Sequence, residues 1–170
     1  MMHQRFFYCP KCGRRLFYRN CGERERLTCS GCGYIFYENP IVGVAVIVLD
    51  GEGRLLLGRR SGSSYNGLWC IPCGYVEYDE EVFAAAVREF KEETGLDVKI
   101  NGVFTVQSNF HNPEVHTVGI WFEAEVTGGE LKAQGDLDRA EYFDLASPPP
   151  LAFPTDIAVI KMLKNLNRTK

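Results

Sequence analysis

Residues 74–96 read GYVEYDEEVFAAAVREFKEETGL, and this stretch decides the fold of the 170-residue chain. Three carboxylates, Glu89, Glu92 and Glu93, follow one another at helical spacing, because positions i, i+3 and i+4 share one face of a helix. Like charges on one face repel each other, so packing alone gives no reason to place them there. Mg²⁺ does give a reason, because it prefers carboxylate oxygen ligands. The stretch therefore predicts a helix that holds a hard cation.

The limits of this helix can be predicted from its flanking residues. Asp79 is a suitable N-cap, and Gly95 suits the left-handed position that follows a helix. Phe83, Val87 and Phe90 recur at helical spacing and are expected to form the apolar stripe that packs on a sheet.

The rest of the chain after residue 38 reads as strands and one further helix. The apolar run Ile41–Leu49 predicts a strand buried on both faces, and Arg54–Arg60 is expected to return beside it as a hairpin. A second helix is expected from Thr155. These elements predict an α/β fold in which helices enclose a mixed sheet. Further strands are expected at Leu68–Cys73, Val103–Gln107, Thr117–Val126 and Glu141–Leu145.

Four of the seven cysteines form two C-x2-C pairs, Cys9 with Cys12 and Cys29 with Cys32, and a glycine follows each pair. This spacing is typical of a structural zinc site with four thiolate ligands, and closed coordination argues against a catalytic metal. About 38 residues bury too little apolar surface to fold alone, so Zn²⁺ would supply the missing stability. We therefore expect a zinc ribbon at residues 1–38 and a second domain at 39–170.

Charge is distributed unevenly between these two parts. Residues 1–38 carry a formal charge of +4, and the remainder carries −7, for a net charge of −3. The balance argues against a protein that coats DNA, although the basic head leaves nucleotide or RNA contact open. The start of the chain lacks a secretory signal, and its longest apolar run is too short to span a bilayer, so no membrane partner and a cytoplasmic location are expected.

With these residues in place, the stretch can be compared with known motifs. The pattern G-x5-E-x7-R-E-F-x-E-E-x-G-L, from Gly74 to Leu96, resembles the Nudix box, with Phe90 where that family more often has an aliphatic residue. The resemblance implies a Nudix-type α/β/α sandwich that uses catalytic Mg²⁺ or Mn²⁺. The catalytic residues that it implies are Glu80, Arg88, Glu89, Glu92 and Glu93. The ligands expected for Mg²⁺ are Gly74, through its carbonyl, and Glu89, Glu92 and Glu93.

The implied reaction is attack of a metal-activated water on phosphorus, which cleaves a phosphoanhydride. Arg88 is expected to position Glu80 and the other carboxylates. Glu93 is the first choice for the general base, and five later carboxylates stay open: Glu123, Glu125, Asp136, Asp138 and Glu141.

Contacts to the substrate are harder to assign from the sequence. The candidates are Arg59, Phe110, His111 and His116, the last three from the loop that contacts substrate in many Nudix proteins. Cys70 and Cys73 form a third C-x2-C pair, for which two packed thiols are favoured over redox regulation or a second metal site.

The arrangement of ribbon and Nudix domain resembles the NADH pyrophosphatase group, and also enzymes acting on FAD or ADP-ribose. Residues 106–113 lack the Pro-Trp pair of the NADH group, so the substrate stays open. The expected function is Mg²⁺-dependent hydrolysis of the pyrophosphate bond in a dinucleotide such as FAD or NADH, in ADP-ribose or in a nucleotide sugar. Two alternatives are a non-hydrolytic nucleotide sensor and an enzyme that processes NAD-capped RNA ends. The expected partner is a nucleotide-derived small molecule; nucleic acid is not favoured, and a homodimer stays open.

Overall fold

The structure, a computed structural model, describes residues 4–62 and 65–167. It divides into two compact units, Met1–Asn39 and Pro40–Lys170. Each unit has its own hydrophobic core. Within the described ranges, no helix is long and apolar enough to cross a membrane.

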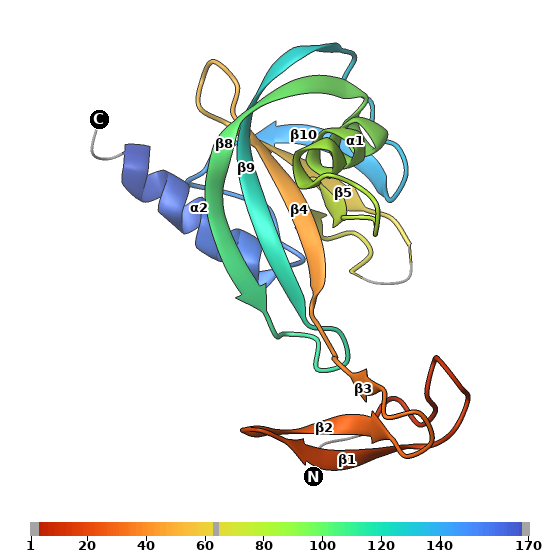
Figure 1. Cartoon of the computed structure of the whole chain (residues 1–170). Helices are drawn as coiled ribbons and strands as arrows, with labels where there is room; N and C mark the ends of the chain where they lie inside the picture. Colours follow the sequence, from red (N-terminus) through yellow and green to blue (C-terminus); the bar gives the residue numbers. More distant parts are fainter. Residues whose placement is uncertain (1–3, 63–64, 168–170) are drawn as a thin grey trace. The chain divides into compact units, whose positions relative to one another are not determined.

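The N-terminal unit is built on a three-stranded antiparallel sheet (Figure 1). Its strands are β1 (Leu16–Cys21), β2 (Arg24–Cys29) and β3 (Ile35–Phe36), and they lie in that order. Its buried core is small, and two of the four buried residues are cysteines. Those four residues are Cys9, Leu16, Leu27 and Cys29.

The larger sheet of the C-terminal unit has the strand order β7-β4-β9-β8. Its strands are β4 (Ile41–Val48), β7 (Cys73–Tyr75), β8 (Leu96–Asn109) and β9 (Thr117–Gly129). Strand β4 pairs in parallel with β9 and antiparallel with β7, so the sheet is mixed, as predicted. A second sheet has the order β10-β5-β6, from β10 (Leu137–Phe143), β5 (Leu55–Arg60) and β6 (Trp69–Cys70).

The predicted hairpin of β4 and β5 is wrong. The turn itself forms, since the backbone N–H of Asp50 donates to the carbonyl of Arg54, but beyond it the strands share only an isolated bridge between Leu49 and Leu55. The two strands then enter different sheets. Strand β9 pairs along the whole of one edge of β4, β7 pairs with residues 43–45 on the other, and β5 pairs instead with β10 and β6.

Helix α1 (Val82–Thr94) begins two residues later than a cap at Asp79 would give. The N-cap is Glu81, whose carboxylate accepts hydrogen bonds from the backbone N–H groups of Phe83 and Ala84 at 2.8 and 3.2 Å. Gly95 ends the helix as expected, with a left-handed φ of 73°.

The apolar face of α1 also differs from the predicted stripe. Phe83 is 45% exposed, although its ring lies against Phe122 at a centroid distance of 5.1 Å. Two residues of the predicted stripe are confirmed, since Phe90 is fully buried and the partly buried Val87 packs against the same core. Ala85 and Ala86, which the stripe did not include, complete the buried face, and their small side chains let α1 lie close to strands β7 and β8.

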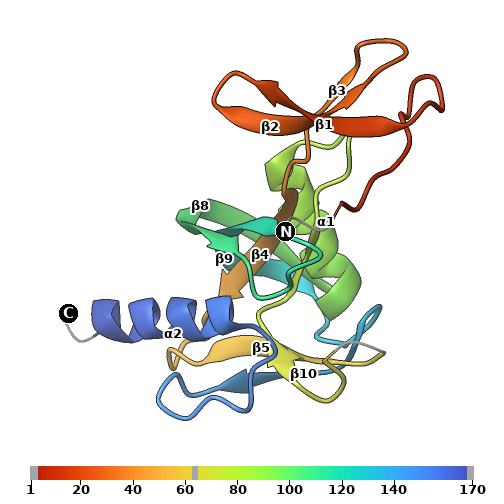
Figure 2. The same ribbon diagram turned by 90° about the horizontal axis from the view of Figure 1, so that it is seen from below.

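Two core layers separate the helices and complete an α/β/α sandwich, which confirms the expected fold class (Figure 2). Alternate residues of β4 face opposite layers: Val46 packs with Phe90 of α1, whereas Ile47 packs with Val159 of α2 (Pro154–Asn167). Strand β4 is therefore buried on both faces, which explains its unbroken apolar sequence.

Candidate functional site

The glutamates of α1 lie against strand β7 at Gly74. A β-carbon on Gly74 would lie 2.0 Å from the carboxyl carbon of Glu89 and 2.2 and 2.5 Å from its oxygens. No side chain fits at these distances, so glycine is what allows the carboxylate to approach the strand. Gly74, Glu89, Glu92 and Glu93 all line one cavity of about 610 Å³.

Arg88 connects the carboxylates of this segment. Its guanidinium donates to both oxygens of Glu80 at 2.7 Å and lies 2.9 Å from Glu89 and 3.4 Å from Glu92. It also donates to the carbonyl of Tyr75 on β7 at 3.2 Å. The hydrogen bonds from Arg88 lower the pKa of Glu80. One cation thus offsets part of the repulsion and fixes the directions of the carboxylates.

Glu93 is the most enclosed of these glutamates, with 5% of its surface exposed. The backbone N–H of Cys73 donates to its Oε2 at 2.8 Å. Burial raises the pKa of Glu93 to about 8; Glu89 and Asp136 act in the same direction, whereas the Cys73 N–H and Arg60 lower it. A buried carboxylate is costly unless it is paired, so Glu93 needs a further positive partner to stay ionised near neutral pH.

This donor set fits a hard divalent cation. It offers three carboxylates in one cavity, one of them buried with a single N–H donor, beside a glycine that leaves room for close approach. Within the described ranges, the glutamate oxygens do not gather within 4.8 Å of one another as the cysteine sulfurs do. That spread suits Mg²⁺, which usually keeps several water and substrate oxygens in its shell.

Three aromatic rings from separate segments form another wall of the cavity. The ring of Phe153 lies 5.2 Å from Tyr65 and 5.9 Å from His111, measured between centroids. Arg60 lies over the Phe153 ring at 5.5 Å, and its buried Nε has no hydrogen-bond partner among the described residues. Tyr65 has a left-handed φ of 60°, which is uncommon for a residue other than glycine. A planar ring with an anionic group would fit this wall.

The structure brings only one of the four expected substrate residues to the cavity. His111 lines it. Arg59 is held elsewhere by Asp138, to which it donates at 2.7 and 2.8 Å. The rings of Phe110 and His116 meet edge to face at a centroid distance of 4.9 Å, and neither residue lines the cavity.

Among the later carboxylates considered as the general base, Asp136 lines the cavity, 3.7 Å from Arg60. Glu125 lies outside it in an ion pair with Lys99. The remaining three, which do not line the cavity, are Glu123, Asp138 and Glu141.

Cys70 and Cys73 lie at the base of this region. Cys70 is fully buried, and a hydrogen bond with it raises the pKa of the Cys73 thiol, with burial acting in the same direction. The Cys73 thiol is thus held neutral, and Cys70 is fully buried beside it, which favours the packing interpretation of this pair.

Asp156 is a buried carboxylate that the sequence did not single out. It lies in the first turn of α2 and accepts hydrogen bonds from the backbone N–H of Ile71 at 3.0 Å and from Nε1 of Trp121 at 3.4 Å. Burial raises its pKa to about 7. An acidic residue in the first turn of a helix is ordinary, so its sequence position carried no signal. Asp156 anchors the segment that continues to Cys73 and its bond to Glu93.

Replacement of Asp156 by asparagine is expected to flatten the pH dependence of stability. A raised carboxyl pKa means that the folded state keeps a proton that the unfolded state releases. The stability that protonated Asp156 contributes to the folded state is therefore fully present below the ordinary pKa near 3.8 and is lost as pH rises through about 7. Between these two pH values, the free energy of unfolding measured with denaturant should fall more steeply with pH in the wild type than in Asp156→Asn. The difference in slope should be up to about 1.4 kcal/mol per pH unit. Equal slopes in the two proteins would contradict the raised pKa.

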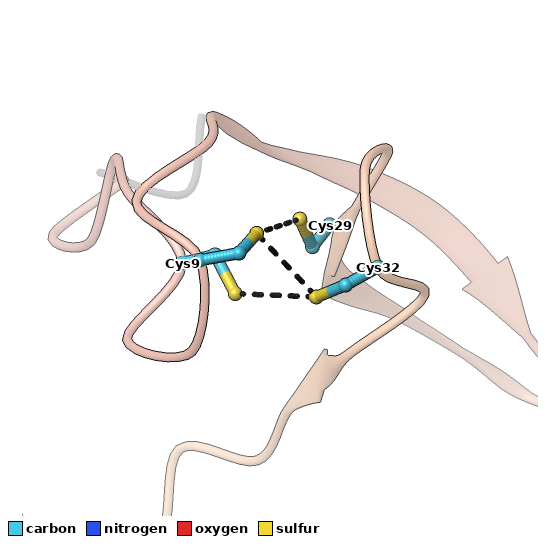
Figure 3. Close-up of side chains that lie close together, drawn as sticks. Cys9, Cys29 and Cys32 are labelled. Atoms are coloured by element: carbon cyan, nitrogen blue, oxygen red, sulfur yellow. Dashed lines mark hydrogen bonds between the residues drawn. The ribbon is translucent and has the colours of Figure 1, made fainter.

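The cysteine cluster of the N-terminal unit is a separate candidate metal site (Figure 3). The sulfurs of Cys9, Cys12, Cys29 and Cys32 all lie within 4.8 Å of one another, with closest pairs at 3.4, 3.5 and 3.7 Å. A tetrahedral Zn²⁺ with bonds of about 2.3 Å separates its sulfurs by roughly 3.8 Å, so the cluster fits this ion. The backbone N–H of Cys32 lowers the pKa of Cys29 to about 6, which favours a thiolate.

Fold and site together define a class of α/β/α proteins that carry an acidic helix beside a cavity. A model of the NUDIX domain matches residues 39–165. An ADP-ribose pyrophosphatase of Methanocaldococcus jannaschii is 39% identical over 138 residues, which cover 81% of this chain and 79% of the relative. The chain therefore belongs to the Nudix family.

Two further similarities extend over the N-terminal unit. The NAD-capped RNA hydrolase NudC of Pseudomonas aeruginosa is 33% identical over 92% of this chain, but the match spans only 53% of that relative. A crystal structure of a NUDIX hydrolase from Nitrosomonas europaea superposes with a TM-score of 0.82 at 25% identity, and covers 96% of this chain and 93% of that one. The match to this solved structure therefore covers residues of both units.

Proposed function

We propose that the C-terminal unit hydrolyses the pyrophosphate bond of a nucleoside diphosphate linked to a second moiety, with ADP-ribose as the first substrate to test. The observation that carries the proposal is the convergence of Glu89, Glu92 and Glu93 on one cavity that also holds Arg60. The M. jannaschii relative, named an ADP-ribose pyrophosphatase, supports the choice of first substrate.

Each group of the site has a separate task in this proposal. Glu89, Glu92, Glu93 and the Gly74 carbonyl would hold Mg²⁺ or Mn²⁺, which would polarise the phosphoanhydride and acidify a water. Arg88 holds Glu80, Glu89 and Glu92 in fixed directions. Glu93 is the first candidate to accept the proton of the attacking water. Its side chain is nearly enclosed, and a poorly solvated carboxylate is a stronger base than an exposed one.

Substrate recognition falls to the other wall of the cavity. Arg60 lines the cavity, and its guanidinium can donate to a phosphate oxygen. The rings of Tyr65 and Phe153 offer faces and edges to a base. Asp136 is the second candidate for the general base, because it alone of the five later carboxylates considered from the sequence lines the cavity.

We also propose that the N-terminal unit is a zinc ribbon, with one structural Zn²⁺ held by Cys9, Cys12, Cys29 and Cys32. The separations of the sulfurs support this ion, as does the small core that the unit has without it.

The proposed hydrolysis can be tested with a panel of substrates in Mg²⁺: ADP-ribose, FAD, NADH, nucleotide sugars and nucleoside triphosphates. The expected result is release of AMP from the adenine-containing diphosphates, with no turnover after Mg²⁺ is removed. NADH is the dinucleotide of greatest interest, because NADH has the same diphosphate linkage as the cap of NAD-capped RNA, the substrate for which the NudC relative is named. Turnover of triphosphates alone, with release of pyrophosphate, would reject the proposed substrate class.

A further inference from the structure

We propose that one face of the sheet in the N-terminal unit binds a single strand of nucleic acid. This face, called the arginine face below, is formed by Phe17, Arg19, Arg24, Arg26 and Tyr37. The inference goes beyond the proposed hydrolysis and does not depend on it, because none of these residues lines the cavity.

The register of the strands separates the arginine face from the core. Leu16, Leu27 and Phe36 pack together in the core of the unit. Successive residues of a strand point to opposite faces, so Phe17 and Arg26, the chain neighbours of Leu16 and Leu27, face away from it. The pairing of β1 with β2 places the arginines of both strands on this outer face.

The charges on this face work against the stability of the sheet. Arg19 and Arg26 are direct cross-strand partners, and like charges directly opposite are destabilising. Neither they nor Arg24 form an ion pair with any residue in the described ranges. Glu25 belongs to the opposite face by alternation along β2. The Tyr37 ring orients Arg26 but neutralises neither charge, so an anionic partner would stabilise this pair.

Two aromatic rings beside the arginines narrow the choice of partner. Phe17 is 50% exposed and Tyr37 is 56% exposed. The guanidinium carbon of Arg26 lies 4.7 Å from the centroid of the Tyr37 ring. Arginines that track phosphates next to rings on which bases stack are the recognition elements for single strands. A duplex hides its base faces and would not stack on the rings, so a single strand is favoured over a duplex.

The modest charge of the unit predicts the strength of the interaction. Residues 1–38 carry a formal +4, and four thiolates with one Zn²⁺ would reduce this by about two. Three of the positive charges lie together on the arginine face, at Arg19, Arg24 and Arg26. Binding is therefore expected to be weak at physiological salt and to strengthen steeply as salt is lowered.

The test uses the full zinc-loaded chain and a short fluorescent oligouridylate, with anisotropy measured over a salt series. The Arg19→Gln and Arg26→Gln double variant should weaken binding at least tenfold and reduce the slope of log affinity against log salt by about 1.4. Phe17→Leu should weaken it about tenfold with little change of slope, because stacking releases no counterions. The matched control is Arg5→Gln, which removes an arginine that is ion-paired to Glu38 and should leave binding nearly unchanged.

Several outcomes would overturn the proposal. They are an absence of saturable binding at low salt, an equal loss in Arg5→Gln, and equal affinity for a duplex of the same length. Tighter binding to phosphatidylserine vesicles than to the oligouridylate would assign the face to a membrane surface instead. Zinc content and thermal unfolding check each variant; relief of the Arg19–Arg26 repulsion should keep or raise the unfolding temperature. If the double variant loses zinc, the same anisotropy measurement is made on Tyr37→Leu, which should weaken binding of the oligouridylate; unchanged binding would overturn the proposal.

Discussion

Replacement of Glu93 by glutamine is expected to lower kcat about a thousandfold while leaving the protein folded. The amide keeps the shape of the side chain, and its oxygen can still accept the N–H of Cys73. It cannot carry the charge that a divalent cation needs, nor accept a proton from water. The loss should therefore appear in kcat, and Mg²⁺ should no longer raise the unfolding temperature as it does for the wild type.

Stability separates this interpretation from a merely structural role. A buried carboxylate with one N–H donor is a cost to the fold, so Glu93→Gln should unfold at the same temperature as the metal-free wild type or higher. The matched control is Glu125→Gln, an exposed glutamate paired with Lys99 outside the cavity, which should keep full activity. A Glu93→Gln enzyme within tenfold of wild-type kcat would remove Glu93 from the reaction and leave Asp136 as the base to test.

The acidic helix could be predicted from the sequence because its information is local. Spacing alone places Glu89, Glu92 and Glu93 on one side of a helix, and Gly95 ends it. The contact between Arg88 and Glu80 follows from their separation of eight residues, close to two turns, although Glu80 itself precedes the helix. The mixed sheet followed from the same kind of pattern, since an unbroken apolar strand needs cover on both faces.

The aromatic wall of the cavity, with Arg60, could not be predicted, because the sequence does not show which residues of β5 face the cavity. Leu55 and Leu57 pack in the α2 layer and Leu56 packs in the α1 layer, so all three are apolar and give no alternation. Without it, nothing distinguishes Arg59 from Arg60. The structure turns Arg60 into the cavity and leaves Arg59 outside.

Contacts across long sequence separations were missed for a related reason. Tyr65 and Phe153 meet from loops 88 residues apart, and Asp156 reaches Ile71 from the first turn of α2. Single residues of this kind have no repeating pattern. The hairpin error has the same origin: the turn after β4 is local, whereas the choice of β9 as its neighbour is made by the tertiary fold.

Removal of Zn²⁺ is expected to unfold the N-terminal unit and leave the C-terminal unit folded. Two of the four buried core residues, Cys9 and Cys29, are proposed zinc ligands, which leaves Leu16 and Leu27 as the other fully buried side chains. Burial of a leucine contributes about 1.5–3 kcal/mol, whereas ordering each residue of the backbone costs about 1–2 kcal/mol. The apolar core cannot offset that cost over the whole unit, so the difference must come from the metal.

The measurement combines zinc content with amide hydrogen exchange under reducing conditions. We expect one zinc per chain, loss of protection confined to Met1–Asn39 after chelation, and the same loss in Cys29→Ser. The matched control is Cys21→Ser, which removes a thiol outside the cluster and should retain zinc and protection. Protection of β1 and β2 that survives complete removal of zinc would contradict the prediction. Because the two units have separate cores, the hydrolytic rate on a small diphosphate should fall little on chelation. Binding of a single strand to the arginine face should be lost with the sheet that carries it.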